Sequence, residues 1–284
     1  MDQIDTPRNF EAAKASLVGD RQCNQDRCLF LGNDDTVLLG LADGLGGHPR
    51  GEVAAQLLMD VCESMFRQAA KPLHDPEQFM LQCIGKAHNA IIQFGRRQQP
   101  PIAPRTTAVL ATIQGGIAYW AHVGDSRLYF IRHGQVLAQT RDHSLVRFVR
   151  ESAHEVSRPR SSLTRCLGGM PQPPTTTCGP PTLLQQGDAI VLCSDGLWGQ
   201  ISDQALVAAL GDARTPVDTS LPTLVRRAAA MPGSDNVTAV ALRWQAPAAV
   251  QSDQSETLEP PRDPRVERAI RHLRGVLKKI STSK

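Results

Sequence analysis

The sequence predicts an α+β layered sandwich in which two sheets are flanked by helices. Two observations favour this class. Blocks of strand-like sequence are interspersed with pairs of segments that have helical periodicity. Glycine-containing turns join neighbouring β-rich runs, a pattern typical of antiparallel hairpins rather than βαβ units.

The first part of the chain alternates between strands and helices. Residues 12–18 and 28–31 are predicted to be short strands, and the apolar run 36–42 a fully buried one. Residues 51–70 are predicted to form a helix because their apolar side chains recur with a period of 3.6 residues. Pro76 can occupy the first turn of a second helix, which continues through residues 80–94.

The second part begins with hairpins and ends with a strand. Residues 143–152 can be helical, but the Pro-rich run 170–181 cannot form a regular element. Helical character appears twice more, over 202–210 and 220–231. The predicted strands of this part are residues 106–113, 117–124, 126–132, 135–139, 188–194 and 236–244.

Composition narrows the class of protein. The 284 residues suffice for one large domain, and an apolar fraction of 41% is ordinary for a globular protein. The net charge is +3, and residues 246–284 hold all of the excess, with eight Lys or Arg against five Asp or Glu. Because residues 1–245 carry 23 of each, we expect no nucleic-acid partner.

The cysteines and the apolar runs indicate a cytoplasmic protein. The seven cysteines are scattered, without a CxxC pair, so we expect reduced thiols rather than disulfides or a zinc site. The polar N-terminal segment has no apolar core of a signal peptide. No run approaches the roughly 18 apolar residues of a membrane span, so the protein is not expected to be transmembrane.

The chain divides into three predicted regions. A globular domain over 1–245 is followed by a polar, Pro-rich linker over 246–264 and a basic amphipathic helical tail over 265–284. Residues 265–280 place their apolar side chains on one helical face. This face could dock to a partner or to an acidic surface, or it could be a cap on the domain over 1–245.

Acidic motifs stand at the ends of apolar runs. Asp43 follows 36–42, Asp195 follows 189–194, and Asp235 precedes 237–242. A lone Asp-Gly pair is ordinarily a turn, but three or more such motifs beside strands favour metal ligation. Carboxylates at strand ends can converge at one edge of a sheet, and oxygen ligands suit Mg²⁺ or Mn²⁺. Two such ions can activate a bridging water and clamp a phosphoryl group.

Six motifs in order resemble the metal-dependent protein phosphatases (PPM, type 2C), especially their compact bacterial members. The resemblance covers about residues 12–243. Its motifs are Gly19-x-Arg21-x-x-Asn24-Gln25-Asp26, Ala42-Asp43-Gly44-x-Gly46-Gly47-His48, Gly124-Asp125-Ser126-Arg127, Asp142-His143-Ser144, Cys193-Ser194-Asp195-Gly196-Leu197 and Gly233-x-Asp235-Asn236-Val237-Thr238. The family implies an αββα sandwich that hydrolyses phosphoserine and phosphothreonine with two Mn²⁺ or Mg²⁺ ions and no phosphoenzyme.

The resemblance assigns roles to single residues. It makes Asp43 the ligand that bridges two metals and Gly44 a backbone ligand, and it makes Asp195 and Asp235 ligands of the first metal. A guanidinium can bind a phosphate through two parallel donors, so Arg21 is expected to hold the substrate phosphate. Asp125 is expected to join Asp195 in binding a weaker third ion, or else to cap a hairpin turn.

The sequence departs from the family pattern near the second metal and in the flap. Gln25-Asp26 stands where some relatives have Glu-Asp, which leaves Asp26 as a water-mediated ligand. The flap between Asp142 and Asp188 is trimmed, so substrate specificity is not carried over. His48 could protonate the leaving serine oxygen or be solvated in its loop. His143 is expected to contact a helix start rather than to act in catalysis.

The leading hypothesis is therefore a protein serine/threonine phosphatase that acts on phosphorylated proteins and reverses a cognate Ser/Thr kinase. One alternative is a pseudophosphatase scaffold, but loss of ligand Asp residues would be its signature, and Asp43, Asp195 and Asp235 are all present. Another is an Mg²⁺-dependent phosphohydrolase of small metabolites.

Overall fold

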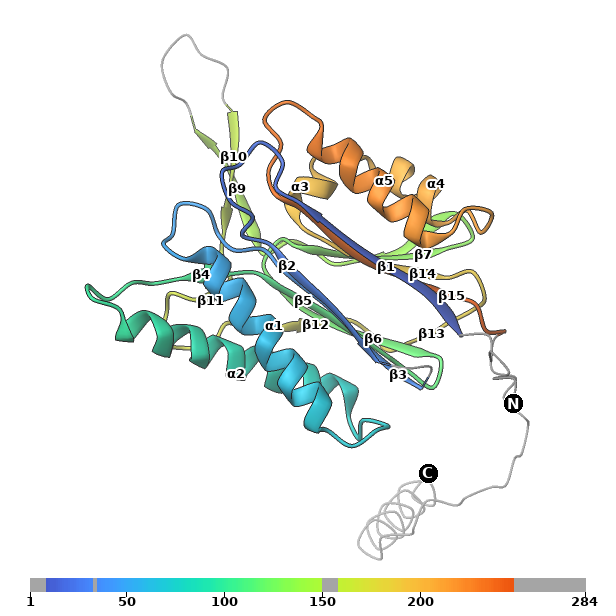
Figure 1. Cartoon of the computed structure of the whole chain (residues 1–284), viewed down its shortest axis with the longest axis horizontal. Coiled ribbons are helices and arrows are strands. Elements are labelled where there is room, and N and C mark those ends of the chain that lie inside the picture. The colour runs from blue at the N-terminus through green and yellow to red at the C-terminus, as the bar shows by residue number, and fades with distance from the viewer. Residues whose placement is uncertain (1–8, 33–34, 150–157, 248–284) are drawn as a thin grey trace, which may run out of the picture. The chain divides into compact units, whose positions relative to one another are not determined.

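The computed structural model describes residues 9–32, 35–149 and 158–247 (Figure 1). The chain divides into two compact units, residues 1–248 and 249–284, and every described residue belongs to the first. Most of the predicted linker and all of the predicted tail helix over 265–280 lie outside the described residues, so the three-region division remains a prediction.

Among the described residues, one sheet has six strands, and each of its strand pairs is antiparallel. One strand in from an edge of this sheet lies β3 (Thr36–Ala42), whose seven residues are all buried, as the sequence predicted. The remaining strands are β2 (Arg27–Gly32), β5 (Ala108–Gln114), β6 (Ile117–Val123), β12 (Thr177–Cys178) and β13 (Thr182–Leu183).

The second sheet has five antiparallel strands in the order β1-β15-β14-β7-β8. Its members are β1 (Phe10–Leu17), β15 (Val237–Trp244), β14 (Ala189–Cys193), β7 (Arg127–Arg132) and β8 (Gln135–Gln139). The predicted α+β class and the predicted antiparallel hairpins β5–β6 and β7–β8 are confirmed.

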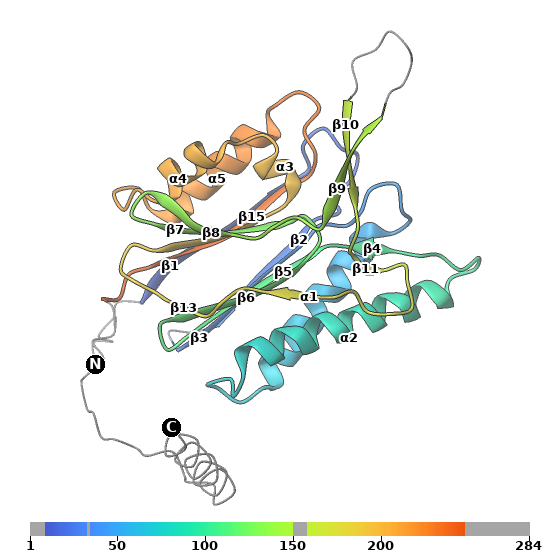
Figure 2. The same ribbon diagram turned by 180° about the vertical axis from the view of Figure 1, so that it is seen from behind.

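The helices lie on the outer faces of the sheets (Figures 1 and 2). On the six-stranded sheet lie α1 (Gly51–Gln68) and α2 (Pro76–Arg97), and on the five-stranded sheet lie α4 (Asp203–Leu210) and α5 (Val217–Ala229). As predicted, Pro76 opens α2, and the Asp75 side chain caps it by accepting the N–H of Gln78. In the described part of the chain, no helix has the length and hydropathy of a membrane span.

Three apolar clusters make up the core. One joins α1 and α2 to the six-stranded sheet, and another joins α3 (Asp195–Trp198), α4 and α5 to the five-stranded sheet. The third lies between the sheets and takes side chains from both, among them Leu39 and Val109 from one sheet and Leu192 and Val240 from the other. This shared cluster fixes the position of one sheet relative to the other, and with it the loops at the strand ends of both sheets.

The described part of 143–152, up to residue 149, does not form the expected helix, and residues 150–152 lie outside the described residues. Residues 144–149 form β9 (Ser144–Val149), which pairs antiparallel with β10 (Arg158–Leu163). A short apolar run does not distinguish helix from strand, and here pairing with a distant segment decides. Other short elements were also not predicted. They are the pair β4 (Arg105–Thr106) with β11 (Leu167–Gly168), helix α3, and the strands β12 and β13. Because β12 pairs with β6, the expectation that 170–181 holds no regular element was wrong at Thr177–Cys178.

Candidate metal centre

Five carboxylates from different parts of the chain line one pocket of about 690 Å³, and one of them, Asp20, lies beside Arg21 and was not singled out as a site residue. Asp43 follows β3 of the six-stranded sheet, and Asp125 lies where the chain crosses from β6 to the other sheet at β7. Asp195 begins α3 directly after β14, and Asp235 lies just before β15. The structure thus brings together Asp43, Gly44, Asp125, Asp195, Asp235 and Arg21, all predicted site residues.

The carboxylates raise one another's pKa values. Burial is the main cause at Asp43, whose pKa is raised further by Asp26, Asp195 and the other acidic neighbours. Burial, assisted by Asp195, raises the pKa of Asp125 to about 7. Burial and the charge of Asp235 also raise the pKa of Asp195. Such a group of partly desolvated negative charges is stabilised by a cation.

The donors fit a hard divalent ion in type, since they are carboxylate oxygens and a backbone carbonyl. Within residues 9–32, 35–149 and 158–247, however, no three His, Cys, Asp or Glu side chains are gathered into a complete ion site. One carboxylate already has a cationic partner, because Nη2 of Arg21 lies 2.6 Å from Oδ2 of Asp235. The shared pocket is nevertheless compatible with such an ion, because water and backbone oxygens normally complete Mg²⁺ shells.

The backbone of Asp43 is fixed by two threonines that the sequence analysis did not single out. The N–H of Asp43 donates to Oγ1 of Thr107 at 2.9 Å, and its carbonyl accepts the N–H of Thr107 and the hydroxyl of Thr106, each at 2.9 Å. Both threonine side chains are fully buried. The Thr-Thr pair before the apolar run 108–111 was the available signal.

Gly44 allows the loop to lie against the start of α1. A Cβ at this position would stand 2.4 Å from the carbonyl carbon of Gly51 and 2.8 Å from the carbonyl oxygen of Gln25. Any larger residue would therefore push the Asp43 loop away from α1. Gly44 lines the pocket, and its role as a backbone ligand remains a prediction.

Asn236 joins the two loops that carry Arg21 and Asp235. Its Nδ2 donates to the carbonyls of Val18 and Cys23, each at 2.9 Å, and its Oδ1 accepts the N–H of Gln25 at 2.8 Å. These three bonds hold the loops that carry Arg21 and Asp235 in place.

Asp26 does not line this pocket, in contrast to Gln25. Its side chain is buried, and Oδ2 accepts the hydroxyl of Ser194 at 2.7 Å. Burial raises its pKa to about 7. Asp26 instead lines a neighbouring pocket of about 330 Å³ with Lys14, Asn24 and Arg27. Its predicted water-mediated ligation stays a prediction.

His48 lies beside the pocket rather than in its lining. Gly46 and Gly47 line the pocket, and the half-buried His48 follows them. Burial, assisted by the charge of Arg105, lowers the pKa of its imidazole. The proposed proton donation by His48 remains a prediction.

His143 does not contact a helix start, so that expectation was wrong. Its ring stacks on His122 with centroids 4.5 Å apart, and Nε2 lies 2.9 Å from the Thr177 hydroxyl. The following residues form β9 rather than a helix.

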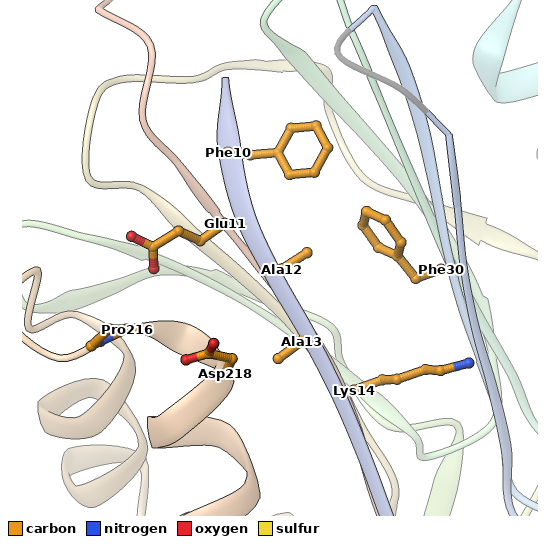
Figure 3. A pocket seen from close by; sticks show the side chains of 8 residues that line it. All are labelled: Phe10, Glu11, Ala12, Ala13, Lys14, Phe30, Pro216 and Asp218. Atoms are coloured by element: carbon orange, nitrogen blue, oxygen red, sulfur yellow. The ribbon is translucent and has the colours of Figure 1, made fainter. Parts of the chain in front are cut away.

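A second pocket, of about 410 Å³, lies away from the carboxylates (Figure 3). It is formed along β1 and β2, where Phe10 and Phe30 lie 5.8 Å apart between ring centroids. Its acidic residues are Glu11 and Asp218. Because the acidic motifs gather elsewhere, we assign the chemistry to the larger pocket.

Comparison with known proteins identifies the family. The family model described as protein phosphatase 2C matches residues 15–226. The chain belongs to the protein phosphatase 2C family. The serine/threonine protein phosphatase PstP of Mycobacterium tuberculosis is 34% identical over 248 residues, which are 80% of this chain and 45% of that protein. The chain thus spans about half of PstP's length.

Solved structures of the family share the fold. The serine/threonine phosphatase of S. agalactiae has a TM-score of 0.70 and 28% identity, covering 83% of this chain and all of that one. The catalytic domain of PstP in complex with two manganese ions has a TM-score of 0.68 and 30% identity, covering 84% of this chain and 99% of that one. The predicted family is confirmed.

Proposed function

We propose that this protein 2C-family chain is a metal-dependent protein serine/threonine phosphatase. One observation carries the proposal: Asp43, Asp125, Asp195 and Asp235 share a single pocket with Arg21. Carboxylates that repel one another beside an exposed guanidinium suit a site that holds cations and a phosphate together.

Each residue has a distinct task in this proposal. Asp43 would be the ligand common to two ions, with Gly44 contributing its carbonyl, and Asp195 and Asp235 would help to hold the first ion. Mn²⁺ or Mg²⁺ bound there would supply an activated water and neutralise phosphoryl charge. The Arg21 side chain is 58% exposed, so an incoming phosphate can reach the guanidinium that contacts Asp235.

The metals and the architecture are proposed at finer detail. We infer two principal ions and a weaker third held by Asp125 and Asp195, supported by the raised pKa of Asp125 beside Asp195. The four-layer αββα arrangement is inferred from the three buried clusters, two under helices and one between sheets.

His48 is proposed to protonate the leaving serine oxygen, because it directly follows the pocket-lining Gly46 and Gly47. We expect His48→Gln to slow hydrolysis of a phosphoserine peptide while sparing p-nitrophenyl phosphate, whose leaving group needs no proton. Equal slowing of both substrates would assign His48 another role.

Substrate class separates the proposal from its rivals. Purified full-length protein with Mn²⁺ should release phosphate from phosphoserine and phosphothreonine peptides far faster than from nucleotides or sugar phosphates. Faster release from the small metabolites would favour the metabolite phosphohydrolase. Tight phosphopeptide binding without release, at any Mn²⁺ or Mg²⁺ concentration, would favour the pseudophosphatase.

The cellular setting is also proposed. We infer a cytoplasmic enzyme that opposes a Ser/Thr kinase; the seven free cysteines are consistent with a reducing compartment.

Residues 265–280 are proposed to dock to a partner or an acidic surface through their apolar face. A chain ending at Ala246 should keep its activity on a small phosphopeptide and lose localisation. A large drop in its melting temperature would instead make the tail a structural cap.

A further inference from the structure

The crossover that carries Asp125 between the sheets is held by contacts from other segments. Gly124 exchanges two hydrogen bonds with His143: its carbonyl accepts the His143 N–H at 2.9 Å, and its N–H donates to Nδ1 of His143 at 3.2 Å. On the other side, Oγ of Ser126 lies 2.7 Å from Oγ1 of Thr107. The main chain on both sides of Asp125 is therefore anchored.

Asp125 itself is held by an indole. Nε1 of Trp198 donates to the carbonyl oxygen of Asp125 at 3.0 Å. Trp198 is the last residue of α3, and Asp195 is the first. The single turn of α3 thus begins at Asp195, a proposed metal ligand, and ends at Trp198, which binds the backbone of Asp125, a second proposed ligand.

A cationic side chain covers the indole. The guanidinium carbon of Arg127 lies 3.6 Å from the centroid of the Trp198 ring. Its Nε and Nη2 donate to the two oxygens of Asp142 at 2.8 and 2.9 Å, and Nη1 donates to the Tyr129 hydroxyl at 3.2 Å. A guanidinium fixed at three nitrogens holds the plane of the ring stacked against it.

We propose that Trp198 is a positioning residue that sets the relation between the carboxylates of Asp125 and Asp195, with Arg127 and Asp142 holding the indole in place. Neither Trp198 nor Arg127 lines the metal pocket, so both act through Asp125 and Asp195. This inference rests on the proposed function, in which these two carboxylates share an ion.

The decisive variant is Trp198→Phe, which keeps an aromatic ring under Arg127 and removes the indole N–H together with the five-membered ring. The full-length protein is titrated with Mn²⁺, and free Mn²⁺ is followed by electron paramagnetic resonance. Asp125→Asn marks which class of bound ions depends on Asp125. Trp244→Phe, the same replacement at the far end of β15, is the matched control.

We expect Trp198→Phe to weaken the ion class lost in Asp125→Asn by about five- to tenfold, the effect of one hydrogen bond. The tighter ions should change less than about twofold, and Trp244→Phe should titrate like the wild type. Melting temperatures measured in chelator should agree between the two tryptophan variants.

Three results would overturn the inference. Unchanged Mn²⁺ binding in Trp198→Phe would remove its positioning role, while the metal site itself would stand. An equal shift in Trp244→Phe would show that the effect is general loss of stability. If Asp125→Asn binds Mn²⁺ like the wild type, Asp125 holds no ion, and the third-ion part of the proposed function fails together with the inference.

Discussion

Nη2 of Arg21 lies 2.6 Å from Oδ2 of Asp235, so the residue proposed to hold phosphate is paired with a proposed metal ligand. Both side chains are substantially exposed, 58% for Arg21 and 38% for Asp235. Because an exposed ion pair is weak, each member can exchange its partner for an ion. A cation can bind Asp235, and a phosphate can bind Arg21.

Arg21→Ala should act mainly on substrate binding. Without the guanidinium, KM for a phosphopeptide is expected to rise by about tenfold or more, since charge-assisted contacts are among the strong ones. Steady-state kinetics with saturating Mn²⁺ measure this. Arg214→Ala, which removes another arginine paired with an aspartate, is the control because it lies far out on the surface, 90% exposed. A fall in kcat at unchanged KM would contradict the assignment.

Asp43→Asn should remove activity without weakening the metal-free fold. We expect a loss of kcat/KM well beyond tenfold, that is more than ~1.4 kcal/mol. In chelator its melting temperature should equal or exceed that of the wild type, because burial and, after it, the neighbouring carboxylates raise the pKa of Asp43, so that its charge is unfavourable there. Asp60→Asn on the exposed side of α1 is the control. More than a tenth of wild-type kcat/KM would refute the bridging role.

Metal removal should abolish turnover and lower stability. Excess EDTA is expected to stop phosphopeptide hydrolysis, and added Mn²⁺ should restore it. Because the ions would bind the folded state, the melting temperature should rise steadily with Mn²⁺ concentration. Scanning calorimetry at several concentrations tests this. Full turnover in EDTA would exclude a metal-activated water.

Asp188→Asn should destabilise the fold far from the pocket. The Asp188 side chain is 1% exposed and accepts Nε and Nη2 of Arg132 at 2.9 and 2.7 Å. Losing its charge leaves a cation without its partner, which costs about 3 kcal/mol. Chemical denaturation measures the change. The control is Asp212→Asn, whose partner Arg214 is 90% exposed, and it should leave the free energy of unfolding nearly unchanged. If Asp212→Asn lowered this free energy as much as Asp188→Asn does, burial of the ion pair would not be the cause.

The stacked pair His122 and His143 should make the fold sensitive to acid. Burial, together with the charge of His122, lowers the pKa of His143 to about 4. A histidine with a lowered folded pKa stabilises above its unfolded pKa of about 6.5, and that contribution is lost as pH falls toward 4. The difference in the free energy of unfolding between wild type and His143→Asn should therefore become smaller from pH 7 to pH 5. Urea denaturation at each pH measures this difference. If it grew toward acid pH, the lowered pKa of His143 would be contradicted.

The sequence alone predicted most of the long elements and pointed to the aspartates that are proposed as ligands. The apolar run 36–42, the periodic segment 51–70 and Pro76 predicted β3, α1 and α2 closely, because these signals are local. The motifs around Asp43, Asp195 and Asp235 indicated the family, because strand-end carboxylates are visible without a fold.

Only the tertiary structure decided which residues meet. Residues 144–149 form a strand because residues 158–163 pair with them. Asp125 does not cap a hairpin turn, because β6 and β7 belong to different sheets. Asp26 turned to Ser194 while Gln25 faced the pocket. Thr107 and Trp198 reach Asp43 and Asp125 across long sequence separations. Such contacts depend on the packing of two sheets, and no local pattern encodes that packing.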